Sequence, residues 1–186
     1  MNDTGSGNDI GDVSISITGL WVETILYEIP ILALTSEAYF KWCDQDWDYR
    51  GQEETAFGKG STLLENGCIF SEFGTRRRRD YHTQGLVMAG LCRAAKNGLE
   101  VGYEGGFSGT SNVHFAMKYG VEPVGTVAHE WYMGIAAIKD DYEHANELAL
   151  RYWLGCFGEG VSCPALTQVS KPHQASLKCS PSTNRF

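Results

Sequence analysis

The stretch CIFSEFGTRRRR, residues 68–79, begins as an apolar run and ends in four consecutive arginines. Its first part, Cys68 to Phe73, is typical of a β-strand, and the Gly-Thr pair then marks a turn into a polar loop. A Gly-Thr pair followed by polar residues occurs again in GTSN, residues 109–112, and in GTVAHEW, residues 125–131. Strand ends followed by such loops are suited to holding a small anion, so the chain predicts a ligand site at the ends of neighbouring strands.

Helical patterns separate these three blocks. Strands and helices that alternate in this way are typical of parallel β/α units, and the predicted fold class is therefore α/β. Before the first block, Pro30 is expected to kink or split a helix, and residues 41–52 read as a linker. The expected strands are residues 14–18, 68–73 and 123–127, residues 102–109 form a glycine-rich loop, and the expected helices are residues 21–40, 55–65, 82–95, 112–119, 131–139 and 142–157.

Composition narrows the range of partners. The net charge of −8 over 186 residues argues against non-specific binding to nucleic acid, so an anionic ligand must be held by a local basic cluster. No apolar stretch is long enough to span a membrane. Six cysteines without C-x-x-C spacing predict no zinc site, and reduced thiols with no signal peptide predict the cytosol.

The run Arg76–Arg79 is the one dense basic cluster of the sequence. A solvated charge run or a nuclear-import patch is the alternative interpretation, and the latter would add a nuclear location. A guanidinium at the end of a strand can bind a carboxylate with two hydrogen bonds and stack on a flat ring. Strand parity would place Arg76 and Arg78 on the same side as Glu72 and Gly74.

In the second block, Ser111 or Asn112 is expected to cap the helix that follows. The start of a capped helix also offers N–H groups to an anion, so capping and ligand binding remain compatible alternatives.

The third block places His129 after a strand and at the beginning of a helix. A zinc-protease motif is excluded because Met133 stands where the second histidine would be. The positive end of the helix dipole favours a neutral, nucleophilic imidazole and would stabilise an attached phosphoryl group. Glu130 could orient the ring, and a purely structural histidine is the alternative. The remaining histidines are interpreted as structural or surface residues, namely His82, His114, His144 and His173.

In this order, the three blocks resemble the nicotinate phosphoribosyltransferase family, in its fungal form, over about residues 15–161. The resemblance implies a partial (β/α) barrel of the type II phosphoribosyltransferase kind with a remnant of an N-terminal domain. The expected boundaries are a disordered segment at residues 1–13, the N-terminal part at 14–66, the first β/α units at 67–161 and an unstructured tail at 162–186.

The resemblance also implies a reaction. Nicotinate would displace pyrophosphate from phosphoribosyl pyrophosphate, with Mg²⁺ carried by the substrate's pyrophosphate and ATP driving the synthesis. His129 matches the family's transiently phosphorylated histidine, whereas Arg76, Thr126 and Ser111 match its substrate contacts. Secondary contacts are expected from four further residues, namely Arg77, Arg78, Asn112 and Glu130.

A second hypothesis stays open beside the enzyme. The later barrel strands of the family have no counterpart in this sequence, and Gln168 stands about where the family has an acid. The chain would then be a truncated, inactive relative that associates with other subunits, forms a homo-oligomer or does not fold stably. Expressed alone, it is expected to be insoluble, oligomeric or molten.

Overall fold

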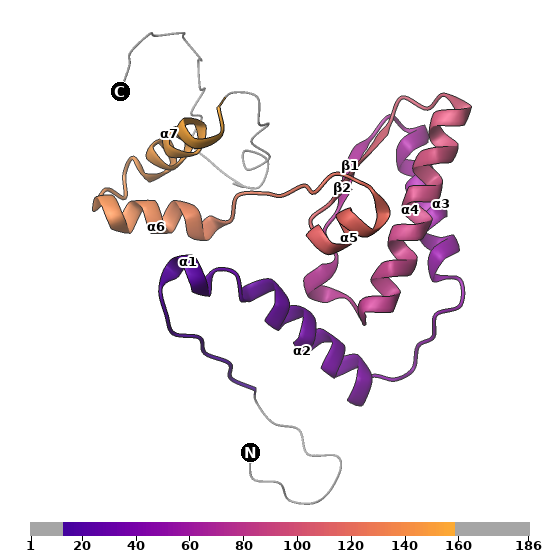
Figure 1. Cartoon of the computed structure of the whole chain (residues 1–186), viewed down its shortest axis with the longest axis horizontal. Helices are drawn as coiled ribbons and strands as arrows, with labels where there is room; N and C mark the ends of the chain where they lie inside the picture. The colour runs from indigo at the N-terminus through magenta and orange to yellow at the C-terminus, as the bar shows by residue number, and fades with distance from the viewer. Residues whose placement is uncertain (1–12, 159–186) are drawn as a thin grey trace, which may run out of the picture. The chain divides into compact units, whose positions relative to one another are not determined.

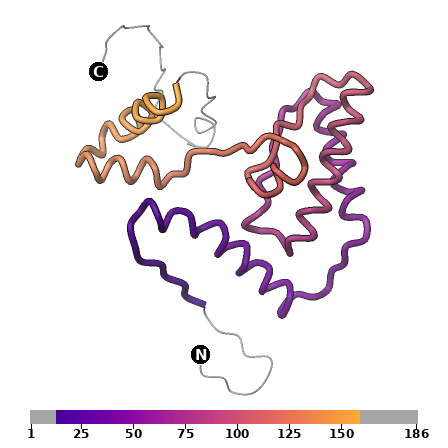
Figure 2. The backbone as a smooth tube through the Cα atoms, viewed as in Figure 1, coloured from indigo at the N-terminus to yellow at the C-terminus, as the bar shows by residue number. Residues whose placement is uncertain are grey.

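The computed structural model describes residues 13–158, and these fall into two compact units divided between Val124 and Gly125 (Figures 1 and 2). Among these described residues, the first unit holds two strands, five α-helices and one 3₁₀ turn, and the second unit holds two helices. In the first unit the elements are α1 (Trp21–Thr24), α2 (Glu28–Trp42), α3 (Gln52–Glu65), β1 (Ile69–Glu72), the 3₁₀ turn η1 (Thr75–Arg77), α4 (Tyr81–Val101), β2 (Gly106–Thr110) and α5 (Val113–Tyr119). In the second unit they are α6 (His129–Lys139) and α7 (Ala145–Phe157).

Strands β1 and β2 are parallel, and α4 is the crossover between them. The register pairs Ile69 with Gly106 and Glu72 with Thr110, with one irregularity between Phe70 and Ser71. A parallel pair joined by a helix is the β/α unit that the sequence pattern predicts, so the α/β class is confirmed. Because the strands are parallel, their carboxyl ends lie at the same edge.

Helix α4 packs closely against α3, and small residues at the contact make this possible. A Cβ atom added to Gly90 would lie 2.4 Å from the carbonyl oxygen of Glu53 and 2.9 Å from the Cβ of Ala56. Next to this contact, Met88 and Ala94 are fully buried. The core of the first unit therefore depends on the close approach of these two helices.

The ends of α4 differ from the predicted ones. Asp80 caps the N-terminus, where its side chain accepts a hydrogen bond from the backbone N of Thr83 at 2.6 Å. The expected end of this helix after residue 95, at the Asn97-Gly98 pair, is wrong, because α4 continues to Val101 and Gly102 is its C-cap with φ 85°. Gly98 lies inside the helix, at a place where α4 passes so close to Leu64 that an added Cβ would lie 3.2 Å from its Cδ1.

Three other elements also differ from expectation. Residues 14–18 form no strand, and residues 106–110, expected as part of a glycine-rich loop, form β2. The predicted strand at residues 123–127 is reduced to one parallel bridge between Thr110 and Pro123. The helix expected over residues 21–40, by contrast, is split into α1 and α2 as predicted, and Pro30 lies in the first turn of α2, where its missing N–H breaks no helical hydrogen bond.

The second unit is a pair of packed helices, α6 and α7. Trp131 donates a hydrogen bond from Nε1 to the carbonyl oxygen of Ala149 at 3.1 Å, and its ring lies 6.5 Å from that of Trp153. Helix α6 begins at His129, two residues earlier than predicted, and α7 begins at Ala145, three residues later than predicted. No helix within residues 13–158 is long and apolar enough to cross a membrane.

Candidate functional site

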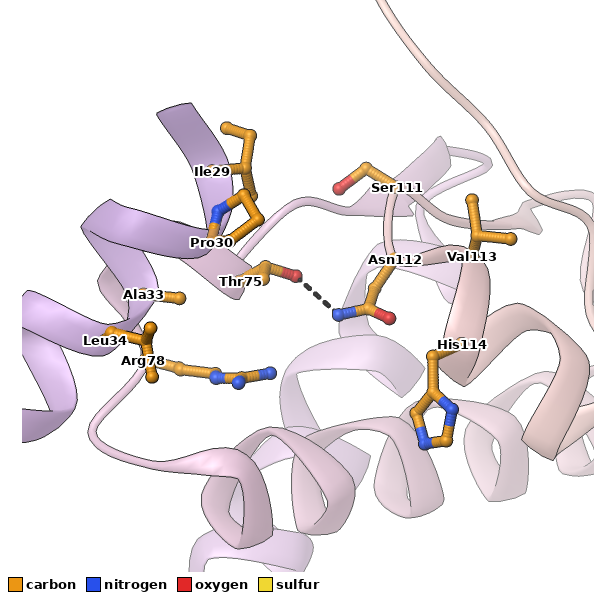
Figure 3. A pocket seen from close by; sticks show the side chains of 10 residues that line it. All are labelled: Ile29, Pro30, Ala33, Leu34, Thr75, Arg78, Ser111, Asn112, Val113 and His114. Carbon is orange, nitrogen blue, oxygen red and sulfur yellow. Dashed lines mark hydrogen bonds between the residues drawn. The ribbon is translucent and has the colours of Figure 1, made fainter. Parts of the chain in front are cut away.

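An open pocket of about 470 Å³ lies at the carboxyl ends of β1 and β2 (Figure 3). The loops after the two strands meet here, and the backbone N of Ser111 donates to the carbonyl oxygen of Glu72 at 2.9 Å. One side of the pocket comes from α2 and the other from the loops and the start of α5. The lining residues are Ile29, Pro30, Ala33, Leu34, Thr75, Arg78, Ser111, Asn112, Val113 and His114.

Arg78 is the cation of this pocket, and its side chain is only 15% exposed. Its Nε donates to Glu37 Oε1 at 2.7 Å, and its Nη1 donates to Gln84 Oε1 at 3.0 Å. In Figure 3 the guanidinium extends from the α2 side toward the side formed by Asn112 and His114. The two partners fix the plane of the guanidinium, so Arg78 presents an oriented group to the pocket.

Asn112 joins the two loops across the pocket. Its Oδ1 caps α5 by accepting from the backbone N of Phe115 at 3.1 Å, which confirms one of the two predicted caps. Its Nδ2 donates to Thr75 Oγ1 at 3.1 Å, the contact drawn in Figure 3. Ser111, half-buried, lies beside it on the pocket wall. Predicted residues Ser111, Asn112 and Arg78 are thus brought together.

The other arginines of the basic run lie elsewhere. The strand parity that was expected for Arg76 does not hold, because β1 ends at Glu72 and residues 75–77 form a 3₁₀ turn. Arg76 does not line the pocket; it is exposed and lies 3.5 Å from the Glu28 carboxylate. Arg77 is exposed as well. Arg79 stacks over the rings of Phe40 and Trp47, at 5.5 and 5.4 Å.

Behind the pocket lies a group of polar side chains that the sequence analysis missed. Glu72, Gln84 and Thr110 are all buried, and Gln84 and Thr110 both donate hydrogen bonds to the Glu72 carboxylate. An acidic residue inside an apolar strand was the available signal for Glu72. No sequence spacing indicates Gln84, because its contact with Arg78 depends on where α4 starts.

A second missed residue is His114, which was interpreted as structural or surface but lines the pocket. Its Nε2 lies 2.9 Å from the hydroxyl of Tyr81, which also accepts from Lys118 Nζ at 3.3 Å. Tyr81 in turn stacks on the buried ring of Phe115, with centroids 4.9 Å apart. His114 therefore connects the pocket to a group of basic and aromatic side chains outside its lining.

The candidate residues of the third block belong to the second unit. Thr126 lies in the exposed segment before α6, and His129 is the first residue of that helix. The residue before it, Ala128, is the N-cap and has no side chain able to cap. Glu130 lies in the first turn and makes contacts of its own. Of the other histidines, His82 packs on the ring of Tyr49 at 4.7 Å, His144 contacts Asp141, and His173 lies outside the described residues.

Near the pocket, Asp80 and Tyr49 form a coupled pair, with the Tyr49 hydroxyl 2.5 Å from Asp80 Oδ2. Burial alone would raise the pKa of Asp80, but hydrogen bonds from Tyr49 and Thr83 outweigh it and hold this pKa below its ordinary value. The same hydrogen bond raises the pKa of Tyr49, with a smaller contribution from burial. The start of α4, directly after the arginine run, is therefore tied to the linker before α3 by a charged contact.

A parallel β–α–β unit with polar, cation-bearing loops at the carboxyl ends of its strands is typical of α/β proteins, in which the strand ends are the usual candidate for a small-molecule site. Comparison with known proteins gives the family. The model of the nicotinate phosphoribosyltransferase (NAPRTase) family matches residues 68–178, more than half of the chain. The chain belongs to this family, which confirms the resemblance found in its three blocks.

Individual relatives agree with the family model. A Schizosaccharomyces pombe protein described as a probable nicotinate phosphoribosyltransferase is 55% identical over 150 residues, which cover 81% of this chain and 36% of that protein. The Saccharomyces cerevisiae nicotinate phosphoribosyltransferase is 53% identical over 157 residues, covering 84% of this chain and 36% of that protein. A crystal structure of a Saccharomyces cerevisiae protein with this enzyme name matches with a TM-score of 0.70 and 56% identity, over 75% of this chain and 33% of that one. The chain thus spans about a third of the length of these relatives.

Proposed function

We propose that this chain supplies part of the nicotinate site of a nicotinate phosphoribosyltransferase. The reaction joins the pyridine nitrogen of nicotinate to C1 of phosphoribosyl pyrophosphate, breaks the bond from C1 to the pyrophosphate oxygen and releases pyrophosphate. Hydrolysis of ATP to ADP and phosphate accompanies it. The observation that carries the proposal is the pocket at the carboxyl ends of β1 and β2, with the guanidinium of Arg78 held in a fixed plane.

The residues of the pocket fit a small ring that bears a carboxylate. The guanidinium of Arg78 has five N–H donors, and its bonds to Glu37 and Gln84 use two of them. Ser111 supplies a hydroxyl on the opposite wall, and α2 supplies apolar surface through residues such as Ile29 and Leu34. We assign Arg78 and Ser111 the carboxylate and ring contacts. Asn112 lines the same pocket, whereas Arg76, Arg77 and Thr126 do not line it and are kept as candidates for other substrate contacts.

His129 is proposed as the residue that accepts the γ-phosphoryl group of ATP. Its place as the first residue of α6 supports this role, because the helix dipole stabilises a negative phosphoryl group there. Glu130, in the same turn, is proposed to orient the imidazole. Phosphorylation would form a bond from an imidazole nitrogen to phosphorus and release ADP, and hydrolysis of that bond would release phosphate.

Mg²⁺ is proposed to arrive with the pyrophosphate of the substrate. No group of three or more His, Cys, Asp or Glu side chains suited to a metal ion occurs within residues 13–158, and the oxygen atoms of pyrophosphate are the ligands that Mg²⁺ prefers. When bound, the ion would neutralise the charge of the leaving group.

The experiment is a turnover assay of residues 1–186 with nicotinate, phosphoribosyl pyrophosphate, Mg²⁺ and ATP, paired with direct titration of nicotinate into the chain. We expect nicotinate to bind in the pocket, with the amide signals of Ser111 and Asn112 shifting in NMR spectra. Binding that leaves these signals unchanged would move the site elsewhere. No binding at millimolar nicotinate would reject the proposal for this chain.

A second candidate role is association with other subunits without catalysis. Its support is the set of apolar side chains that the first unit exposes, including Ile69, Leu99 and Met117, with 78%, 81% and 77% of their surface accessible. Size-exclusion chromatography at several concentrations tests it. A concentration-dependent mass without nicotinate binding would favour this role over the enzyme.

A further inference from the structure

Glu72 is a carboxylate that β1 buries at the edge where the pocket opens, with 7% of its surface exposed. Three groups donate to it. Oε1 accepts from the backbone N of Gly74 at 2.6 Å, Oε2 accepts from Thr110 Oγ1 at 2.6 Å, and Gln84 Nε2 lies 3.2 and 3.0 Å from the two oxygens. The carboxylate is therefore well satisfied by neutral donors.

These donors come from both loops of the pocket. Gly74 opens the turn that leads to Arg78, and Thr110 ends β2. The hydroxyl of Thr110 also accepts from the backbone N of Asn112 at 3.1 Å. One carboxylate thus holds the loop after β1 with one oxygen and the loop after β2 with the other.

The contact with Gln84 connects the same carboxylate to Arg78. A carboxylate can only accept hydrogen bonds, so the amide nitrogen of Gln84 must face Glu72 and its carbonyl oxygen must face away. That oxygen accepts from Arg78 Nη1 at 3.0 Å. Gln84 is only 3% exposed, so solvent does not offer its amide an alternative partner.

None of the ion pairs recorded among residues 13–158 includes Glu72. Burying an unpaired carboxylate is unfavourable, and a glutamine of the same size would fill the space without that penalty. A glutamine, however, could turn its NH₂ toward Gln84 and reverse the second amide. The carboxylate, which only accepts hydrogen bonds, and the guanidinium, which only donates them, together fix the order carboxylate, amide, guanidinium, and Glu72→Gln removes the first of these two constraints.

We propose that Glu72 is a positioning residue for the anion site: through the buried amide of Gln84 it holds the Arg78 guanidinium in the orientation that receives the carboxylate of a ring substrate, and through Gly74 and Thr110 it holds the two loops together. This inference rests on the proposed function, which makes nicotinate the probe. Glu72 itself does not line the pocket and is not expected to touch the ligand.

The test uses residues 1–186 as wild type, Glu72→Gln and Gln84→Met, with Glu53→Gln as the matched control. Glu53 pairs with Arg93 on the exposed side of α3, so the control makes the same chemical change away from the pocket. The affinity for nicotinate is measured on folded protein by titration. We expect Glu72→Gln and Gln84→Met each to weaken binding by about tenfold to a hundredfold, and Glu53→Gln to leave it unchanged.

The reciprocal variant Glu72→Gln/Gln84→Glu separates positioning from a general structural role. It returns a carboxylate next to Arg78 and keeps an amide behind it, so we expect it to recover a substantial part of the affinity lost in Glu72→Gln. A Glu72→Gln variant that melts at a lower temperature but binds nicotinate like the wild type overturns the proposal. A reciprocal variant no better than Glu72→Gln overturns it too.

If the wild type does not bind nicotinate, that result counts against the proposed function alone. The positioning role of Glu72 is then tested by a measurement that needs no ligand. Hydrogen exchange at Arg78 Nε–H is then measured in the same variants. Protection in the wild type and in Glu53→Gln that is lost in Glu72→Gln and Gln84→Met supports the positioning role. Equal protection in all four overturns it.

Discussion

The strand-end site of the first unit and the helix pair of the second unit hold their candidate residues in different ways. In the first, Glu72, Gln84 and Thr110 come from three separate elements, and the last two both donate to the Glu72 carboxylate behind the pocket. In the second, Thr126 and His129 lie on an exposed segment and at an exposed helix start, while packing relies on rings such as Trp131 and Trp153. One site is built by contacts between distant residues, and the other by local helix geometry.

Because of this difference, the two sites call for different measurements. A pocket whose polar groups are mutually bonded has a defined orientation, so substitutions there act through geometry and are read in binding. A histidine that is placed only by the start of a helix has no such network of contacts, so its role must be tested by the reaction it undergoes. The predictions below test the two kinds of site separately.

The largest effect is expected at His129. Replacing it with Ala removes the imidazole that we propose to carry the phosphoryl group, so incubation with labelled ATP should leave no acid-labile, base-stable label. In a complete enzyme that contains this segment, ATP stimulation of turnover should also disappear, whereas weak ATP-independent turnover should remain. Mass spectrometry of the labelled peptide identifies the site.

His144→Ala is the matched control, since His144 lies in the same unit and contacts Asp141 at the start of α7. It should keep the full label. Undiminished label in His129→Ala, or loss of label in both variants, would remove the phosphohistidine role from His129.

The next largest effect is expected at Gly109, where the backbone of β2 has φ 134°. A Cβ atom there would lie 2.0 Å from the carbonyl oxygen of Glu122, which is backbone and cannot rotate away. Gly109→Ala should lower the free energy of unfolding by roughly 3 kcal/mol or more, because it combines strain with a backbone clash. Urea unfolding measures the loss.

Hydrogen exchange then shows where the loss falls. If the two units are as distinct as their contacts indicate, protection should fall in residues 52–124 and persist in α6 and α7. Gly58→Ala is the control, because an added Cβ in α3 meets nothing within 4 Å and alanine should stabilise the helix by about 0.5–1 kcal/mol. Uniform loss of protection across both units would contradict the view that the two units are separate.

The sequence predicted well those features that depend on local pattern. The α/β class, the parallel arrangement, the cap at Asn112 and the neighbourhood of Ser111 and Arg78 follow from hinges, caps and apolar runs. Strand β2 was missed because its glycines lower strand propensity, although pairing with β1 and the bridge to Pro123 overrides that preference.

The remaining errors have a shared cause in tertiary contacts. Gly98 reads as a helix end, but it is where α4 passes close to Leu64. Arg76 was preferred over Arg78 because it matches the substrate contact of the resembling family, whereas the 3₁₀ turn brings Arg78 to Glu37 and Gln84 at the pocket. Partners 41 and 6 residues away along the chain leave no periodic signal in the sequence.

A smaller, specific effect is expected among the arginines. Arg78→Lys keeps the charge but loses the planar group that Glu37 and Gln84 hold, so nicotinate binding should weaken by about 1–3 kcal/mol. Arg79→Lys should weaken it much less, since Arg79 stacks on Phe40 and Trp47. Calorimetric titration of nicotinate measures both.

Arg76→Lys tests whether Arg76, as the resemblance implies, or Arg78, as the pocket indicates, is the main contact to the carboxylate of nicotinate. The structure places Arg76 outside the pocket, beside Glu28, so a small effect is expected. A loss larger than that of Arg78→Lys would restore Arg76 as the main carboxylate contact. Equal losses at all four arginines would favour a diffuse electrostatic role and weaken the contrast between an organised pocket and an exposed surface.

The smallest effect is expected at Asp80, which ties the start of α4 to Tyr49 in the linker before α3. Its pKa is lowered in the folded state, so the carboxylate contributes stability above its ordinary pKa of 3.8 and this contribution is lost as the pH falls below that value.

Asp80→Asn keeps a good capping side chain but removes the charge, so only the charge-dependent part is lost, a few tenths to about 1 kcal/mol after allowance for solvent screening. Urea unfolding at pH 7 should therefore show a less stable variant, and the difference from the wild type should shrink as the pH falls below 3.8. The raised pKa of Tyr49 has the opposite sign, since its contribution is present below pH 10 and lost above it, and Tyr49→Phe tests that arm. A difference between Asp80→Asn and the wild type that stays constant from pH 7 to pH 3 would show that the contact acts by packing rather than by charge, and the polar organisation attributed to the first unit would then end at the pocket.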